Sequence, residues 1–210
     1  MLPVEPSVLG AFVVAVTAIV MSPGPDTMVI LRHALASGQR SGLAAVAGVQ
    51  LGLVAHTALA VVGISLIVAS SPVLFKSVAV AGAAYLAWLG VQGLRDTGDL
   101  GVSQARAAAG WARACRDGAV SNLLNPKVIL IFLALFPNFV ETGRGDVEAQ
   151  LITLAVVLIA INVLWQAPIA WAAETVRRLL GRPKVGRAVS RVSGAVLIAF
   201  AALMILDHLV

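Results

Sequence analysis

The stretch Met21-Ser22-Pro23-Gly24-Pro25-Asp26 lies inside the first long apolar run of the chain. Its two prolines and its glycine remove backbone hydrogen bonds and weaken a helix, at a depth where an unpaired amide costs several kcal/mol. A carboxylate follows at once, and Asp26 in the middle of a membrane span would cost about 2.5–3.5 kcal/mol. A broken membrane helix that carries a charge is typical of a transporter binding site. We therefore predict that Pro23, Gly24 and Pro25 break the helix and that Asp26 faces a polar interior.

The composition is that of a polytopic membrane protein. Of the 210 residues, 60% are hydrophobic and 12% are charged, and the mean hydropathy is +0.96. An average soluble domain carries about 25% charged residues. The net charge of +5 is spread in short clusters between apolar runs, so we expect a lipid bilayer around the chain and no nucleic-acid partner. The single cysteine, Cys115, excludes an internal disulfide and a paired-thiol motif.

Six apolar runs are long enough to cross about 30 Å of hydrocarbon, which takes roughly 20 helical residues. They cover residues 7–31, 42–69, 73–94, 118–140, 149–173 and 189–207, with boundaries uncertain by several residues. The sequence thus predicts an all-α, polytopic integral membrane protein that forms a single transmembrane domain over residues 1–210. Its six transmembrane helices include a broken first helix and a broken fourth helix.

The distribution of Lys and Arg predicts the orientation of these helices. Twelve basic residues lie in or beside the odd-numbered connections: Arg32, Arg40, Arg95, Arg106, Arg113, Arg116, Arg177, Arg178, Arg182, Lys184, Arg187 and Arg191. The even-numbered connections hold Lys76 and Arg144. Because Lys and Arg favour the cytoplasmic side, we expect the odd-numbered loops in the cytoplasm and both termini outside.

The first and fourth runs resemble each other. Pro25-Asp26 and Pro126-Lys127 each place a charge after a proline and before an apolar stretch. We interpret residues 1–95 and 118–210 as two three-helix repeats joined by a loop over about 96–117. Since each repeat has an odd number of helices, the two insert in opposite directions, as in many secondary transporters. We expect Asp26 and Lys127 to face one cavity near the midplane, either paired directly or bridged by water or substrate.

Small residues recur at helical spacing. Gly38 with Gly42 and Gly48 with Gly52 form small-xxx-small pairs, and the third run continues the theme with Gly82, Gly90 and Gly93. Such residues let membrane helices approach closely. The pattern predicts a tightly packed bundle.

The two charges can each bind a group of opposite charge on a solute. Asp26 can accept a cationic group, and Lys127 or the free amides of a broken helix can accept an anionic group. Asp26 is also a candidate carrier of a coupled proton. The alternative is a buried structural ion pair that holds the two halves together.

Further polar residues in the runs are candidates for the same site, each with a structural alternative. Asn122 and Asn125 either bind substrate or cap the amides that Pro126 frees. Gln50 and His56 either line the pathway or form interhelical hydrogen bonds. No cofactor and no metal site is expected.

Candidates in other parts of the runs are less specific. Asn162, with Gln166 and Pro168 nearby, either lines the cavity or serves helix packing. Tyr85 and Trp88 either close the substrate pocket or fill the bundle. His33 and His208 lie near the membrane ends and are expected to be solvated.

Four blocks of the sequence resemble the LysE/RhtB family of amino-acid exporters. They are Ser22-Pro23-Gly24-Pro25-Asp26, Gly38-Gln39-Arg40-Ser41-Gly42, Gly82-Ala83-Ala84-Tyr85-Leu86-Ala87-Trp88-Leu89-Gly90 and Asn122-Leu123-Leu124-Asn125-Pro126-Lys127. The resemblance implies a six-helix protein of a bacterial-type inner membrane that exports amino acids by using the proton gradient. It implies further that Pro23, Gly24, Pro25 and Asp26 form the first motif, and Asn122, Asn125, Pro126 and Lys127 the second. With an amino acid as substrate, Asp26 suits the ammonium group of the zwitterion, and Lys127 or the free amides of the broken helix suit its carboxylate. The resemblance leaves open which amino acid is exported and whether the protein forms a homodimer.

Other classes of function require residues that can be sought in the sequence. An intramembrane enzyme needs a nucleophile with a base, and an electron carrier needs paired cysteines or histidines, so neither class is expected. A channel, or an efflux transporter for another small solute or cation, stays open as the alternative. The acid, histidine and cysteine clusters that a transition metal prefers are missing from the runs.

Overall fold

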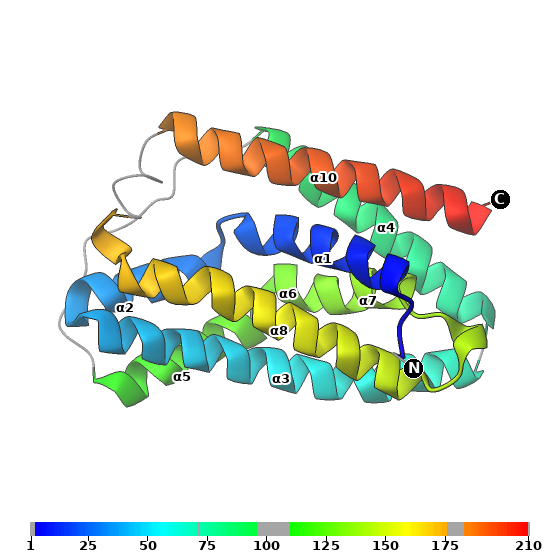
Figure 1. The fold of residues 1–210 in the computed structure, drawn as a ribbon, viewed down its shortest axis with the longest axis horizontal. Helices are drawn as coiled ribbons and strands as arrows, with labels where there is room; N and C mark the ends of the chain where they lie inside the picture. Colours follow the sequence, from blue (N-terminus) through cyan, green and yellow to red (C-terminus); the bar gives the residue numbers. More distant parts are fainter. Residues whose placement is uncertain (1–2, 71, 96–109, 176–182, 210) are drawn as a thin grey trace.

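The computed structural model describes residues 3–70, 72–95, 110–175 and 183–209, and this part of the chain is all-helical. In chain order the elements are α1 (Pro6–Met21), α2 (Pro25–Ser37), α3 (Gln39–Ser70), α4 (Pro72–Arg95), α5 (Trp111–Leu123), α6 (Pro126–Leu130), the π-helical turn η1 (Ile131–Leu135), α7 (Phe136–Asn138), the 3-10 turn η2 (Thr142–Arg144), α8 (Val147–Trp171) and α10 (Pro183–Leu209). Figure 1 shows them as a bundle of roughly aligned helices.

The described helices account for six membrane-spanning segments. Gln39–Ile64 of α3 and the whole of α8 are each long and apolar enough to cross a bilayer. α1 with α2, and α5 with Lys127–Asn138, form two more spans that are bent by 54° and 57° at their breaks. α4 and α10 complete the bundle with 24 and 27 residues and pack against each other. The predicted fold class, with a broken first and a broken fourth helix, is confirmed.

Proline and asparagine explain why the helices restart where they do. Pro25 is the first residue of α2 and Pro126 the first of α6, a position where the missing N–H of proline costs nothing. The Asn125 side chain caps α6, because its Oδ1 accepts a hydrogen bond from the backbone N–H of Lys127 at 3.0 Å. The breaks are therefore encoded locally in the sequence.

The predicted start of the fourth span was wrong. The helix before the second break begins at Trp111, so residues 111–117 of the expected loop are helical. Exposed Trp111, Arg113 and Arg116 make this helix polar in composition, and a search for apolar runs therefore misses it. Residues 96–109 of the expected loop lie outside the described residues.

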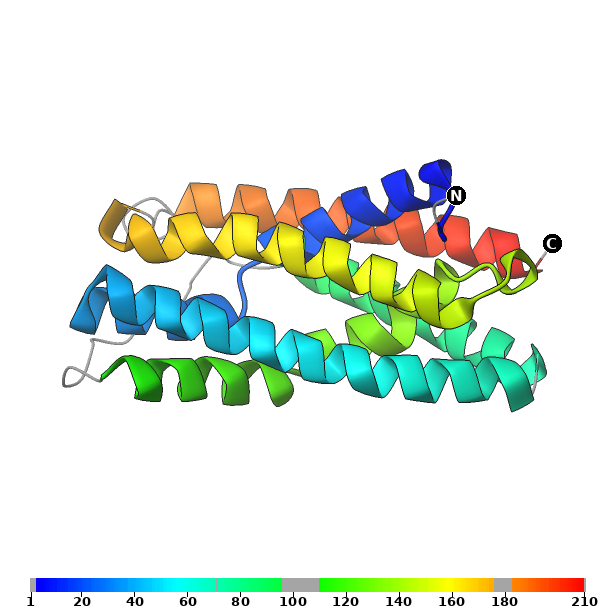
Figure 2. The same ribbon diagram turned by 60° about the horizontal axis from the view of Figure 1, so that its bottom comes forward.

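The connections between consecutive helices lie at the two ends of the bundle. The beginning of α1, the end of α10, the α3–α4 turn and η2 lie at one end (Figures 1 and 2). The α2–α3 turn and the starts of α5 and α10 lie at the other end. Both described ends of the chain are thus on the same side, as an even number of spans requires. Which side faces the cytoplasm stays a prediction from the Lys and Arg distribution.

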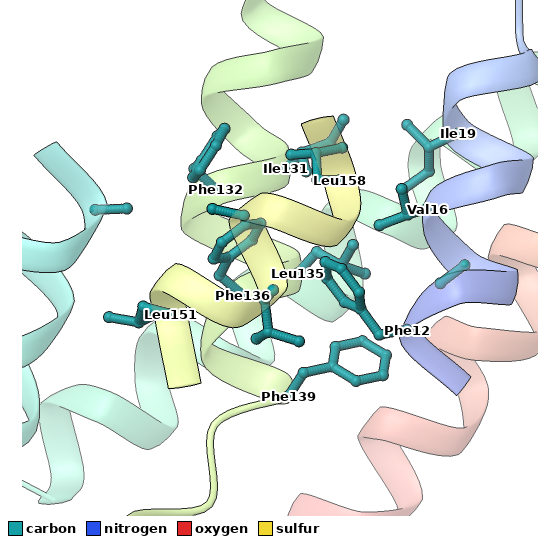
Figure 3. Close-up of a cluster of buried hydrophobic side chains, with 14 of the residues drawn as sticks. Phe12, Val16, Ile19, Ile131, Phe132, Leu135, Phe136, Phe139, Leu151 and Leu158 are labelled. Atoms are coloured by element: carbon teal, nitrogen blue, oxygen red, sulfur yellow. The ribbon is translucent and has the colours of Figure 1, made fainter. Parts of the chain in front are cut away.

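Two apolar cores lie on opposite sides of the helix breaks. Core 1 gathers residues of α1, η1, α7 and the first half of α8 with parts of α3, α4 and α10, and Figure 3 shows its aromatic centre. There the Phe12 ring meets Phe136 edge-on at a centroid distance of 5.7 Å, and Phe139 at 5.2 Å. Core 2 gathers residues of α2, α5, the first part of α3 and the end of α8. Each core therefore contains one half of each broken span.

Glycine brings α3 and α5 into backbone contact. A Cβ atom at Gly48 would overlap the carbonyl oxygen of Cys115, and one at Gly52 would lie 2.6 Å from Oδ1 of Asn122. The predicted close packing of this glycine pair is confirmed. It holds α5 against α3 at the level where α5 ends.

The other glycines of the predicted pattern have different roles. A Cβ at Gly42 would lie 2.6 Å from Cβ of Ala34, so this glycine also serves packing. Gly38 does not, because nothing lies within 4 Å of its would-be Cβ; it ends α2 with a φ of +84° instead. The surroundings of Gly82, Gly90 and Gly93 lie outside the described residues.

The glycine contact predicts a specific loss of stability. Gly48→Ala should destabilise the protein by about 1–3 kcal/mol, because the new methyl group must force α3 and α5 apart. Thermal unfolding in detergent measures the effect as a Tm lower by several degrees. Gly63→Ala on the same helix is the control, since nothing lies within 4 Å of that position. Equal Tm values for the two variants would contradict the proposed packing.

Candidate functional site

A polar layer separates the two apolar cores. Its side chains come from both helix breaks and from the middle of α3 and α8: Asp26, Gln50, His56, Ser121, Asn122, Asn125, Lys127, Asn162 and Gln166. Most of these side chains are buried. We use the term polar layer for this set below.

Asp26 is buried in the first turn of α2, with 6% of its surface exposed. Its Oδ1 accepts a hydrogen bond from Ser121 Oγ at 2.8 Å. Its Oδ2 accepts hydrogen bonds from Nδ2 of Asn122 at 2.9 Å and from Nδ2 of Asn125 at 3.2 Å. All three donors belong to the second helix break. Hydrogen bonds to an ionised group are about twice as strong as neutral ones, so this carboxylate ties α2 firmly to the end of α5 and the start of α6.

Lys127 makes the reverse connection. It lies in the first turn of α6, and its Nζ donates a hydrogen bond to the carbonyl oxygen of Ser22 at 2.8 Å. Ser22 is the residue that follows α1, where the helix dipole favours a cation. Each break thus sends its charged side chain to the other break, so the two connections are reciprocal.

Asp26 and Lys127 line one small cavity together with Asn125, Asn162 and Gln166. Its volume is about 40 Å³, and a buried water needs about 10–15 Å³ of such space. The cavity therefore has room for a few water molecules and is too small for an amino acid in this conformation. Within it, Lys127 points to Ser22 and not directly to Asp26.

Gln50 and His56 lie beside this cavity. Gln50 Nε2 donates to Oε1 of Gln166 at 3.3 Å and thereby links α3 to α8. His56 Nε2 donates to the carbonyl oxygen of Asn122 at 3.3 Å, and the ring stacks on Phe132 at a centroid distance of 5.6 Å. Both residues form the interhelical contacts that were the alternative to lining the pathway. His56 lines a separate apolar pocket of about 400 Å³ between α3 and η1.

Of the two aromatic candidates, Trp88 is 52% exposed on α4 and does not line the cavity. The side chain of Tyr85 lies outside the described residues, as does that of His208.

A second polar contact joins α2 to α5, and the sequence interpretation missed it. His33 is buried, contrary to the prediction, with 3% of its surface exposed. Its Nε2 donates to Oδ2 of Asp117 at 3.1 Å, and the guanidinium of Arg32 donates to the same oxygen at 3.0 Å. Asp26 and His33 are seven residues apart, which is two helical turns and the same face of α2. That spacing was the available signal.

Ser121 was also missed, although it is next to the predicted Asn122. Its hydroxyl completes the coordination of the Asp26 carboxylate. Within residues 3–70, 72–95, 110–175 and 183–209, no three His, Cys, Asp or Glu side chains gather as a metal site would require.

The fold and the site define a multi-pass membrane translocator. Residues 17–208 match the family model described as LysE type translocator, and the chain belongs to this family. The resemblance of its four sequence blocks is thereby confirmed.

Named relatives are similar over almost the whole chain. The homoserine/homoserine lactone efflux protein of Salmonella typhi is 29% identical over 92% of this chain and 94% of its own length. The leucine efflux protein of Klebsiella pneumoniae is 30% identical over 91% of each chain. A membrane protein of Vibrio cholerae is 32% identical over 85% of this chain and 88% of its own. No solved structure matches the chain.

The contact around Asp117 predicts how α5 is held. Asp117→Asn removes the negative charge that Arg32 and His33 share, so α2 and α5 should separate more often. The native Cys115 on α5, half-buried, reports this as faster labelling by a maleimide.

Asp146→Asn is the matched control. It makes the same chemical change at the residue that caps α8, and the labelling rate should stay at the wild-type value. A wild-type rate in Asp117→Asn would contradict a role of Asp117 in holding the two helices.

Proposed function

We propose that the protein exports amino acids or close derivatives from the cytoplasm and that the proton gradient drives this export. The observation that carries the proposal is the pair of helix breaks that contact each other. They bring an acid and a base to one cavity between two apolar cores. Relatives named as homoserine and leucine efflux proteins support the substrate class. The protein acts as a transporter without enzymatic chemistry.

The two cores correspond to two gates. The contacts of Asp26 and Asp117 hold α2 against α5 on one side of the polar layer. On the other side, the Lys127–Ser22 hydrogen bond and the aromatic contacts of Phe12 hold α1 against α6 and α7. Both sets of contacts are formed here and the cavity is small, so this conformation is the state between the two open ones. Opening one gate at a time gives alternating access.

Asp26 is suited to couple proton binding to the first gate. As a carboxylate it accepts hydrogen bonds from three donors. When a proton binds, one carboxyl oxygen of Asp26 becomes an O–H donor. It then faces side chains that are themselves donors, and the carboxyl group can accept fewer hydrogen bonds. The neutral form therefore weakens the link between α2 and α5, and the ionised form keeps this gate closed.

Lys127 is suited to bind the substrate carboxylate and, by doing so, to weaken the contacts of the second gate. Its ammonium group has three protons, of which one is used at Ser22. A substrate carboxylate in the cavity competes with the Ser22 carbonyl oxygen for this cation. Substrate binding thus loosens the contact between α1 and α6.

The orientation follows the distribution of basic residues. The end of the bundle with the α2–α3 turn and the start of α5 faces the cytoplasm, and both termini face outward. The gate held by Asp26 and Asp117 is then the cytoplasmic gate. A bacterial-type inner membrane supplies the proton gradient.

Purified protein in liposomes tests the proposal. Vesicles loaded with a mixture of amino acids, leucine and homoserine included, should release a particular one when a proton gradient is imposed, with saturable counterflow. Asp26→Asn should abolish the response to the gradient while the variant stays folded in the membrane, because the amide cannot take up and release the proton.

The matched control is Asp146→Asn, at which wild-type transport is expected. Gradient-driven export by Asp26→Asn at the wild-type rate would refute the coupling role. Conduction by the wild type that does not saturate and does not respond to a gradient would refute the transporter and indicate a channel.

A further inference from the structure

We propose that Asn162 on α8 is the acceptor for the ammonium group of the substrate, and that Asp26 is not. This inference rests on the proposed function and assigns the second end of the zwitterion within the same cavity. Lys127 and Asn162 both line that cavity. They come from α6 and α8, so a zwitterion held between them connects these two helices.

Asn162 offers an unused hydrogen-bond acceptor. Its side chain is buried, with 7% of its surface exposed. Within the described part of the chain, its Oδ1 has no hydrogen-bond donor. A buried polar atom without a partner has a free-energy cost. An ammonium group that enters the cavity can donate to this oxygen and thereby removes the cost. A neutral oxygen binds an ammonium group less tightly than a carboxylate does, which suits release on the far side of the membrane.

Asp26, by contrast, already accepts hydrogen bonds from three donors in this state. Ser121, Asn122 and Asn125 donate to its two oxygens at 2.8, 2.9 and 3.2 Å. An ammonium ligand at Asp26 would compete with the donors that hold α2 to α5. The same carboxylate also has to accept the coupled proton under the proposed function. Separate residues for the proton and the ammonium group remove this conflict.

The other unpartnered amide oxygens of the polar layer are placed differently. Oδ1 of Asn122 lies toward Gly52 on the α3 side, where a Cβ would meet it at 2.6 Å. Gln50 carries an unpartnered Oε1 but does not line the cavity. Oε1 of Gln166 already accepts from Gln50. Among the amide side chains that the structure describes in the polar layer, Asn162 is thus the one that brings an unpartnered oxygen to the cavity that Lys127 lines.

The test compares ligands with and without the ammonium group. Counterflow of labelled leucine or homoserine is measured in liposomes, in competition with unlabelled leucine and with 4-methylpentanoate, which carries hydrogen in place of the ammonium group. The variants are Asn162→Leu, which has a similar size and no acceptor, and Asn162→Asp, which restores one. Thr153→Val is the control on the same helix, because the Thr153 hydroxyl bonds to the carbonyl oxygen of Ala149 in its own helix.

Asn162→Leu should weaken competition by leucine about tenfold or more and leave competition by 4-methylpentanoate within about twofold of wild type. Asn162→Asp should recover most of the preference for leucine. A merely structural role would weaken both competitors equally, because it does not depend on the ammonium group. Thr153→Val should keep the wild-type preference.

An unchanged preference for leucine in Asn162→Leu, or an equal loss for both competitors, overturns the assignment of Asn162 and leaves the proposed function in place. A lost preference in Asp26→Asn alone also overturns it and assigns the ammonium group to Asp26. A wild-type protein that exchanges no amino acid of the mixture overturns the assignment together with the proposed function.

Discussion

An interrupted helix inside hydrocarbon must have its free backbone and side-chain polar groups satisfied by the protein itself. The reciprocal contacts between the two breaks meet this requirement. Asp26 at the start of α2 accepts hydrogen bonds from donors of the second break. Lys127 at the start of α6 donates to the carbonyl oxygen of Ser22, in the first break. Neither break is complete without the other. The gap in each helix, the polar layer and the cavity therefore exist as one unit.

Under the proposed function, this dependence explains how a small bundle can have two gates. Because the breaks fall at the same depth, each broken span contributes one half to core 1 and the other to core 2. α3 and α8 run through both cores and hold them together, with Gly48 and Gly52 keeping α5 against α3. The contacts at the breaks join the halves within each gate, so loss of one contact affects one side of the membrane.

Much of the fold could be predicted from the sequence, because membrane spans and helix breaks are local properties. Apolar runs located the helices, and Pro25 and Pro126 marked where α2 and α6 begin. The start of α5 was missed, since its charged residues hide a helix that packs through Gly118 and Ala114. The charges at the breaks were identified, but their partners depend on how the chain folds back. Ser121 donates to Asp26 from 95 residues away, and His33 meets Asp117 across 84.

The central claim is that the ionised Asp26 side chain keeps α2 and α5 together. The most direct test is the distance between spin labels at residue 36 near the C-terminal end of α2 and at residue 113 on α5, in a background with Cys115 replaced by serine. The wild-type protein should give a single short distance. In Asp26→Asn, which lacks the carboxylate, a second, longer distance should appear. The wild-type distance alone in Asp26→Asn would contradict the claim.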